Sequence, residues 1–199
     1  MNELLSSTRE ALTKTGNESS DFDLNKNVVL PKDRKLRPAA VLAPIILGQN
    51  GYDLILTKRS SALKYHPGQI AFPGGKKEKT DVDLIDTALR EAHEEIGIPR
   101  VYTEVLGTFA SHETITGFKV TPVVALVKQE FEFQVDTGEV AEAFRVPLSH
   151  VLEASNYVIE SRLWRGQRRY YYVVPYGPYY IWGATARILR AWTDLINLN

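Results

Sequence analysis

Residues 74–98 read GGKKEKTDVDLIDTALREAHEEIGI, and the second half of this stretch has the pattern of one amphipathic helix. Apolar side chains recur in it at steps of four, three and four residues, which places them on one helical face. These positions are Ile85, Leu89, Ala92 and Ile96. Gly97 follows directly, and glycine is the usual residue where a helix ends in a left-handed conformation. The stretch therefore predicts a helix that packs one face on a core and ends at Gly97.

The same helix would carry three glutamates on another face. Glu91, Glu94 and Glu95 are spaced at i, i+3 and i+4, so their carboxylates are neighbours. Like charges at this spacing destabilise a helix by about a few tenths of a kcal/mol per pair. A divalent cation would turn that repulsion into coordination, and Mg²⁺ or Mn²⁺ suits hard carboxylate ligands. We therefore expect a metal-binding helix; the alternative, from these residues alone, is a solvated acidic face.

Two neighbouring features favour the metal site. A Pro-Gly-Gly turn ends at Gly75, and glycine lets the backbone approach a ligand closely. Arg90 directly precedes the acids and can orient one carboxylate through a bidentate pair. Glu91 and Glu95, one turn apart, are the first choice of metal ligands, with the Gly75 carbonyl completing the shell. Glu94 would be a third ligand or the general base.

The stretch resembles a known sequence block, the Nudix box, G-x5-E-x7-R-E-U-x-E-E-x-G-U, in which U is an aliphatic residue. The matching positions are Gly75, Arg90, Glu91, Glu94, Glu95, Gly97 and Ile98, with Ala92 as a loose match. Asp81 stands where the box has its first Glu, and the spacer from Asp81 to Arg90 is one residue longer than in the box. The match is specific because many positions are fixed at set spacing.

Resemblance to the Nudix hydrolases implies a fold and a reaction class. The fold would be α/β (α+β), an α/β/α sandwich with a central mixed β-sheet and a metal-binding helix. Bound Mg²⁺ or Mn²⁺ would offset the charge of a diphosphate and lower the pKa of its water. Such enzymes often take a further acid from beyond the box, so Glu139 or Glu142 is a candidate ligand or base, beside Glu94 and the orienting Arg90. The alternative for Glu139 and Glu142 is a surface acid at the start of a strand.

The loop before the helix is rich in basic and polar residues. Arginine supplies planar donors and lysine a point charge, so such a loop suits a polyphosphate. The candidate substrate-binding residues are Lys58, Arg59, Ser60, His66, Gly68, Gln69, Phe72 and Gly74. The alternatives are surface charges at a strand end for Lys58 and Arg59, and a backbone-bonded loop histidine for His66.

Residues 54–60 (LILTKRS) and 68–75 (GQIAFPGG) resemble the coenzyme A pyrophosphatase branch of the Nudix hydrolases, in which the longer spacer also occurs. Similar blocks at 116–124 and 181–189 extend the resemblance from about Arg37 to the end of the chain. The implied reaction is hydrolysis of coenzyme A or acyl-coenzyme A to 3′,5′-ADP and 4′-phosphopantetheine or its acyl form. Two alternatives stay open: a Nudix hydrolase for another nucleoside diphosphate derivative, such as ADP-ribose, and a non-catalytic module that binds nucleotide or RNA.

Basic residues alternate with aromatic ones in residues 161–175, which read SRLWRGQRRYYYVVP. This interleaving would suit RNA, through charge and base stacking. The chain has a formal net charge of zero, however, so we expect no nucleic-acid partner and favour a hairpin that lines a nucleotide site. An adenine would stack on one of the residues Tyr170 to Tyr172.

Length and patterning indicate one domain, since 199 residues can bury a core and no repeat is present. We predict a Nudix domain over 37–199, preceded over 1–36 by a solvated arm of one short helix and a polar linker. An alternative is that Lys35 or Arg37 faces a phosphate. Strands are predicted at 39–47, 52–57, 101–109 and 118–127, a short helix within 146–152, and a last helix from 181.

The composition limits partners and compartment. The chain has no cysteine, which excludes disulfides and thiolate sites and fits a reducing compartment. The first residues lack the apolar core of a signal peptide, and no apolar run approaches the ~18 residues of a membrane span. We therefore expect a cytoplasmic monomer or homodimer that acts on a small molecule and does not bind a membrane.

Overall fold

The structure is a computed structural model and describes residues 3–14, 16–28, 31, 33–164 and 166–197. Its helices are α1 (Glu3–Thr13), α2 (Leu84–Ile96), α3 (Leu148–Val151) and α4 (Gly183–Ile196), with the short 3-10 turns η1 (Arg100–Tyr102) and η2 (Ala154–Asn156). Its strands are β1 (Ser19–Ser20), β2 (Arg37–Gly48), β3 (Gly51–Arg59), β4 (Ile70–Ala71), β5 (Gly74–Lys76), β6 (Thr103–Thr108), β7 (His112–Glu113), β8 (Phe118–Val127), β9 (Val140–Pro147), β10 (Val158–Trp164) and β11 (Gln167–Val173).

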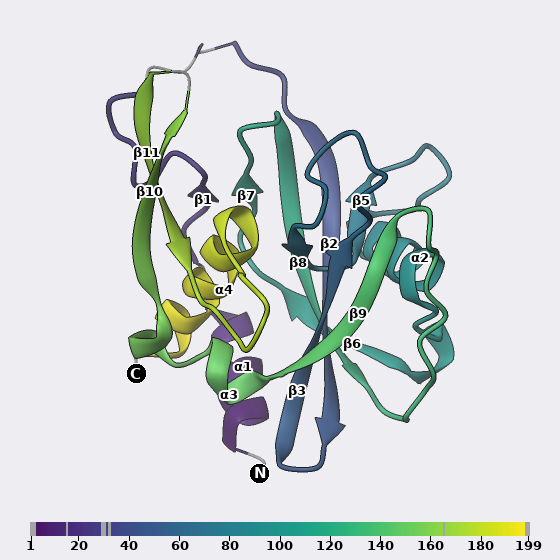
Figure 1. The fold of residues 1–199 in the computed structure, drawn as a ribbon. Helices are drawn as coiled ribbons and strands as arrows, with labels where there is room; N and C mark the ends of the chain where they lie inside the picture. The colour runs from purple at the N-terminus through teal and green to yellow at the C-terminus, as the bar shows by residue number, and fades with distance from the viewer. Residues whose placement is uncertain (1–2, 15, 29–30, 32, 165, 198–199) are drawn as a thin grey trace.

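Nine of the strands form one central mixed sheet, in which β2 lies between β8 and β3 (Figure 1). β2 pairs with β8 in parallel and with β3 and β5 antiparallel. β6 pairs with β8, and β9 pairs with β3. β10 and β11 form a separate two-stranded sheet. The predicted α/β/α sandwich with a mixed sheet is confirmed.

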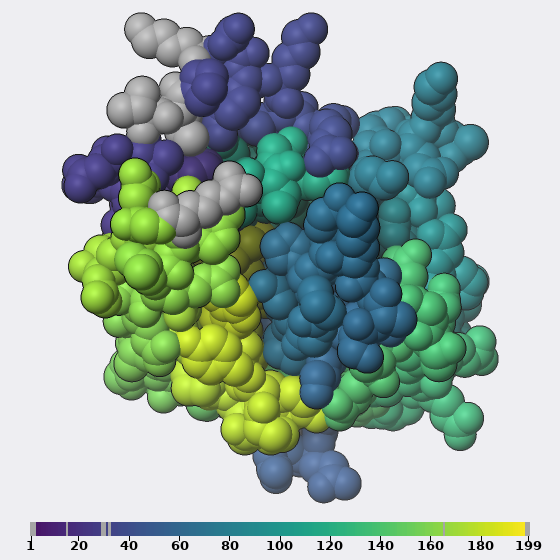
Figure 2. Space-filling view, turned by 45° about the horizontal axis from the view of Figure 1, so that its top comes forward, coloured from purple at the N-terminus to yellow at the C-terminus, as the bar shows by residue number. Residues whose placement is uncertain are grey.

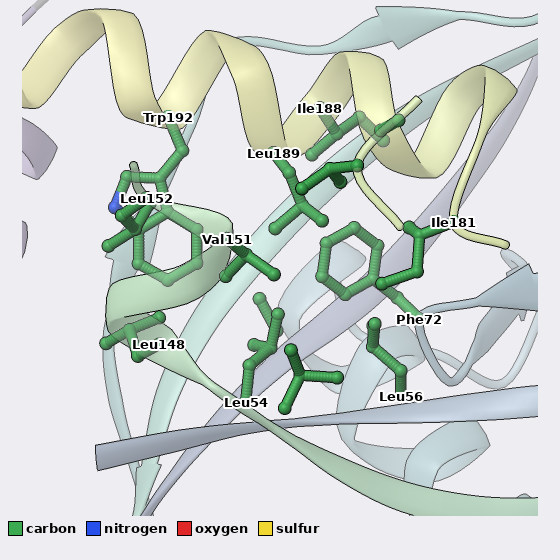
Figure 3. Close-up of a cluster of buried hydrophobic side chains, with 14 of the residues drawn as sticks. Leu54, Leu56, Phe72, Leu148, Val151, Leu152, Ile181, Ile188, Leu189 and Trp192 are labelled. Atoms are coloured by element: carbon green, nitrogen blue, oxygen red, sulfur yellow. The ribbon is translucent and has the colours of Figure 1, made fainter. Parts of the chain in front are cut away.

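The two faces of the sheet bury two separate apolar clusters. Alternate side chains of a strand point to opposite faces, so Leu42 packs toward α2 while Ala43 packs toward α4. On the α4 side, Leu54, Trp192 and Leu189 lie in a fully buried cluster (Figure 3). The sheet is thereby fixed between α2 on one face and α1, α3 and α4 on the other.

Most predicted elements are present with small shifts at their ends. The strand predicted at 118–127 has these bounds, and the hairpin of β2 and β3 turns between Gly48 and Gly51. The strand predicted at 101–109 is partly wrong, because a 3-10 turn occupies residues 100–102 and the strand begins at Thr103. Among the described residues no helix is long and apolar enough to cross a bilayer.

The expectation of a solvated arm is wrong for two described parts of residues 1–36. Thr8 and Ala11 are buried where α1 packs against α4 and β6. The segment predicted as a linker forms β1, which pairs in parallel with β7. Asp23 also receives a hydrogen bond from Arg187 of α4. These contacts are tertiary, so the polar composition of the segment did not reveal them; a domain boundary near residue 36 stays a prediction.

Candidate active site

The helix α2 carries the acids and is fixed at both ends. The Asp83 side chain accepts a hydrogen bond from the Asp86 N–H at the first turn, and Gly97 ends the helix with φ 75°. The predicted C-terminus at Gly97 is confirmed. Ala92 and Ile96 are fully buried against the sheet, and Glu91 and Glu95, on the neighbouring face of the helix, lie against the Gly74–Gly75 turn.

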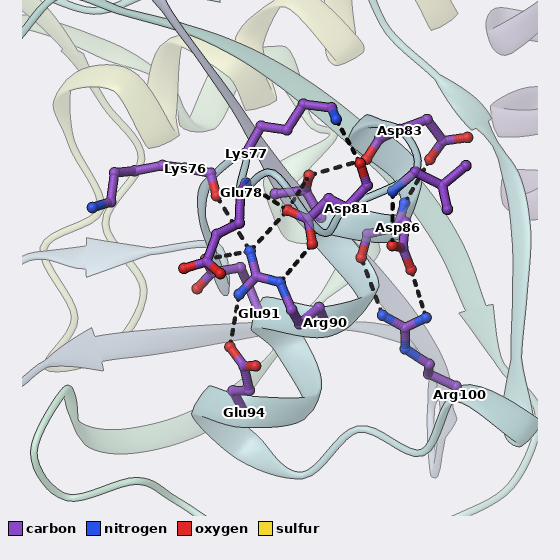
Figure 4. A network of polar contacts seen from close by, with 12 residues as sticks. Lys76, Lys77, Glu78, Asp81, Asp83, Asp86, Arg90, Glu91, Glu94 and Arg100 are labelled. Atoms are coloured by element: carbon purple, nitrogen blue, oxygen red, sulfur yellow. Dashed lines mark hydrogen bonds and ion pairs between the residues drawn. The ribbon is translucent and has the colours of Figure 1, made fainter.

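Asp81 anchors the arginine of the motif (Figure 4). Arg90 donates from Nε and Nη2 to the two Asp81 carboxylate oxygens at 2.8 and 3.0 Å. Asp81 also accepts hydrogen bonds from the Glu78 N–H and the Thr87 hydroxyl, and its side chain is only 1 % exposed. The hydrogen bonds from Arg90 hold the pKa of Asp81 well below its usual range. The acid in the position of the first Glu therefore holds Arg90 in place.

Arg90 in turn contacts two acids of the helix. Its Nη2 lies 3.0 Å from Glu91 Oε1, and its Nη1 donates to Glu94 Oε2 at 2.8 Å. The Glu94 side chain is 56 % exposed and is held on the outer side of Arg90. Arg90 thus contacts Glu91, the acid that it was expected to orient, and it also forms an ion pair with Glu94.

Glu95 and Glu91 face the glycine turn. Glu95 is 4 % exposed and accepts one long hydrogen bond, 3.3 Å, from the Gly74 N–H. Burial, together with the charges of Glu91 and Glu139, raises the pKa of Glu95 to about 8. Burial also raises the pKa of Glu91. A Cβ atom built on Gly75 would lie 2.5 Å from Glu91 Cδ, so only glycine leaves room for this carboxylate.

The acids fit a metal ion in part. No group of three His, Cys, Asp or Glu side chains within the described residues is arranged to hold a metal ion. Glu94 in particular does not join Glu91 and Glu95, because Arg90 holds it outside. What remains is the buried carboxylate of Glu95 and the partly buried one of Glu91, both with raised pKa values, beside a glycine backbone, and this set of hard oxygen donors suits Mg²⁺ or Mn²⁺.

Glu139 and Glu142 lie in different surroundings. The charge of Glu139 raises the pKa of both Glu91 and Glu95, so the Glu139 carboxylate interacts electrostatically with both. Glu142 instead accepts a hydrogen bond of 2.5 Å from the Tyr179 hydroxyl on the other side of β9. Of the two candidate acids, only Glu139 affects the pKa values of Glu91 and Glu95, while Glu142 is bonded to Tyr179.

A cavity of about 340 Å³ opens next to this turn. Figure 2 shows it as the recess between the hairpin β10–β11 and the loop of residues 60–70. Five of the predicted substrate-binding residues line it: Arg59, His66, Gln69, Phe72 and Gly74. Arg59 is near enough to Glu95 to lower its pKa, and the buried Arg59 Nε has no hydrogen-bond partner among the described residues. Arg169, which also lines the cavity, has a buried Nε of the same kind.

Three predicted substrate-binding residues do not line the cavity. Lys58 is exposed near the end of β3. Its backbone lies opposite that of Glu142 in the register of β3 and β9. The hydroxyl of Ser60 is buried and accepts a hydrogen bond from the Ala62 N–H. The Gly68 N–H donates to the Arg59 carbonyl, in a left-handed conformation with φ 70°. These residues shape the loop around Arg59.

The hairpin β10–β11 lines the opposite wall, as the interleaved sequence predicted. Its contributions are Arg162, Arg169, Tyr170 and Tyr171, and Trp182 lies beside them. Sequence reasoning missed Trp182, the loop of residues 114–116, and Asp21 and Asn25 of the supposed linker. The sequence around Asn25 does not predict that it lies at the site. Two hydrogen bonds with the backbone of Tyr170, far along the chain, hold it there.

Known proteins share this chain's sequence and fold. Residues 36–165 match the model of the NUDIX domain. The Uncharacterized Nudix hydrolase NudL of Enterobacter sp. (strain 638) is 42% identical over 154 residues, which are 77% of this chain and 80% of that protein. Its namesake from Citrobacter koseri is 39% identical over 171 residues, 86% of this chain and 88% of that protein. A crystal structure of a MutT protein from Methanosarcina mazei Go1 has a TM-score of 0.53 at 20% identity, covering 85% of this chain and 99% of that one, and supports the fold alone. The chain therefore belongs to the Nudix hydrolase family.

Proposed function

We propose that this protein hydrolyses the diphosphate of coenzyme A or acyl-coenzyme A to 3′,5′-ADP and (acyl-)4′-phosphopantetheine, with Mg²⁺ or Mn²⁺. The proposed setting is the cytoplasm, with free small molecules as substrates and a monomer or homodimer as the working unit. The observation that carries the proposal is the convergence of Arg59, Gln69 and Gly74 on one cavity wall beside Glu95. These three residues come from the two blocks that resemble the coenzyme A pyrophosphatase branch.

The charges near Glu95 support a metal-assisted attack on a diphosphate. Glu91 and Glu95, with the Gly75 carbonyl, would hold the cation, which offsets phosphate charge and acidifies a bound water. Arg59 lines the cavity, and its buried Nε has no hydrogen-bond partner among the described residues, so its guanidinium can bind an anionic oxygen. Arg90 keeps Glu91 oriented. Glu139 or Glu94 would accept the proton of the attacking water, and Glu94 would be the choice only if Arg90 released it.

The size and lining of the cavity support a substrate with a nucleotide part. Tyr171, Tyr170 and Trp182 supply aromatic surface on the wall opposite Arg59. An adenine bound there would stack on or against these rings. This feature suits coenzyme A and also other adenosine diphosphate derivatives, so a Nudix hydrolase for ADP-ribose remains the second candidate.

The test is a panel of diphosphate substrates with the purified protein and Mg²⁺ or Mn²⁺, read by product mass. The panel would contain coenzyme A, an acyl-coenzyme A, ADP-ribose and a dinucleoside polyphosphate. We expect the highest kcat/KM for a coenzyme A substrate, with 3′,5′-ADP as a product. A preference of tenfold or more for ADP-ribose would replace this proposal by the second candidate, and no turnover of any substrate would favour a binding module.

A further inference from the structure

Two arginines face each other across the hairpin that forms the outer wall of the cavity. Arg162 of β10 and Arg169 of β11 are direct partners in the antiparallel register. Side chains of such a pair stand on the same face of the sheet about 5 Å apart at Cβ, and like charges there destabilise the pair. A hairpin that only had to fold would gain from another residue at either position.

Neither guanidinium is neutralised by a carboxylate among the described residues. Arg162 lies over the ring of Trp182 at 4.4 Å, and Arg169 lies over the ring of Trp164 at 4.1 Å. The buried Nε of Arg169 has no hydrogen-bond partner within the described part of the chain. Aromatic rings fix these cations in place while leaving N–H donors unused.

The acids close to the pair are already engaged. Glu160, two residues before Arg162 on the same strand face, accepts a hydrogen bond of 2.5 Å from the Tyr180 hydroxyl. Asp21, which also lines the cavity, accepts a hydrogen bond from the Ile115 N–H at 2.8 Å and lies 3.1 Å from His112 Nε2. Neither acid forms an ion pair with Arg162 or Arg169 among the described residues, so both guanidinium groups can bind an anionic ligand.

The arginine pair shares its cavity with the end at which the diphosphate would be cleaved. Arg162 and Arg169 line it on one side, and Arg59 and Gly74 line it on the other. Asn25 forms two hydrogen bonds of 2.9 Å with the Tyr170 backbone. These bonds fix β11, which carries Arg169, next to the cavity. One elongated ligand can thus meet two cationic regions.

We propose that Arg162 and Arg169 bind a phosphomonoester dianion of the substrate, separate from the diphosphate that is cleaved. The inference rests on the proposed function, in which the substrate is coenzyme A and the dianion is the phosphate on its ribose 3′-oxygen. Two guanidinium groups supply the paired donors that a dianionic phosphate accepts. The pair then acts as a specificity determinant, selecting nucleotides that carry this second phosphate.

The direct test measures binding of 3′,5′-ADP and of 5′-AMP by calorimetry, with EDTA present. Arg162→Gln and Arg169→Gln remove the charge and leave a shorter, neutral polar side chain. A hydrogen bond to a charged group is worth about 1.5 to 3 kcal/mol, so each change should weaken 3′,5′-ADP by roughly tenfold to a hundredfold. Binding of 5′-AMP should change by less than about threefold. Arg168→Gln is the matched control, because Arg168 lies on the opposite face of the hairpin and donates to Ser161 Oγ.

A second measurement separates this inference from the proposed function. The ratio of kcat/KM for coenzyme A over dephospho-coenzyme A should exceed tenfold in the wild type and fall toward one in Arg162→Gln and Arg169→Gln. Unchanged ratios in both variants, with coenzyme A still cleaved, overturn the arginine site and leave the function intact. If neither compound is cleaved, the function fails, and the calorimetry with 3′,5′-ADP still decides for or against the site.

Discussion

The ion pair of Asp81 and Arg90 gives the sharpest test of how the helix α2 is held. The Asp81→Asn change keeps the shape of the side chain and removes the charge that receives two hydrogen bonds from Arg90. Breaking a buried ion pair is worth about 3 to 5 kcal/mol. Arg90 is 19 % exposed and keeps Glu91 and Glu94 as partners, so we expect the lower end, about 3 kcal/mol.

The loss should be visible in equilibrium unfolding by urea at pH 7 with EDTA present. In thermal unfolding of a chain of this size, a loss of about 3 kcal/mol in the free energy of unfolding lowers Tm by roughly 6 to 12 °C. Asp194→Asn is the control: it breaks the exposed pair with Arg190 on α4, for which we expect less than about 1 kcal/mol. If Asp81→Asn unfolds at the same urea concentration as the wild type, Asp81 is not the anchor inferred here.

The pH dependence of this difference has a defined sign. Hydrogen bonds from Arg90 lower the pKa of Asp81 in the folded protein, so its contribution is complete above the unfolded value of about 3.9. The contribution is lost as pH falls through the lowered folded value. The stability gap between wild type and Asp81→Asn should therefore be constant from pH 8 to pH 5 and shrink below about pH 4. A gap that instead widens in acid would contradict the assignment.

Three further changes test the site and the core. Glu95→Gln should keep the fold by circular dichroism and lower kcat by about a thousandfold or more, because it removes a proposed metal ligand; near-normal kcat at saturating Mg²⁺ would refute that role. Gly75→Ala should lower kcat at least about tenfold, since its Cβ would displace the Glu91 carboxylate, with Gly166→Ala in the β10–β11 turn as the kinetic control. Leu189→Ala should lower the free energy of unfolding by about 2 to 5 kcal/mol in urea melts, because Leu189 is fully buried under the sheet; a change below about 1 kcal/mol would count against the packing.

Sequence reasoning succeeded where the signal is local. The apolar stripe that ends at Ile96, followed by Gly97, predicts α2 and its terminus, because helix periodicity and a left-handed glycine need no distant partner. The same holds for β8, an apolar segment with six of its ten residues buried, four of them in one run from Pro122 to Ala125. The role of Asp81 could not be predicted from the sequence. Asp81 is shorter than the Glu of the box and the spacer to Arg90 is longer, so only the folded loop shows that the two side chains meet.

Sequence reasoning failed where contacts join distant segments. Residues 19–25 look like a polar linker, yet Ser19 bonds His112 and Asn25 bonds the backbone of Tyr170. These partners lie far along the chain, and polar side chains carry no periodicity that would indicate them. The sequence predicted that the hairpin lines the site, but Trp182, Asp21 and Asn25 were found at the cavity only in the structure.

The distribution of charge explains why a neutral chain can still build a site for a highly charged ligand. Arg90 takes up the charges of Asp81 and Glu94, which leaves Glu95 buried with a raised pKa and a single long hydrogen bond. Close to Glu95, Arg59 keeps a buried Nε without a hydrogen-bond partner among the described residues. Opposite charges that lie this close would ordinarily pair directly and neutralise each other. Held apart by the fold, they would be satisfied together by the ligand that we propose, a diphosphate with a divalent cation.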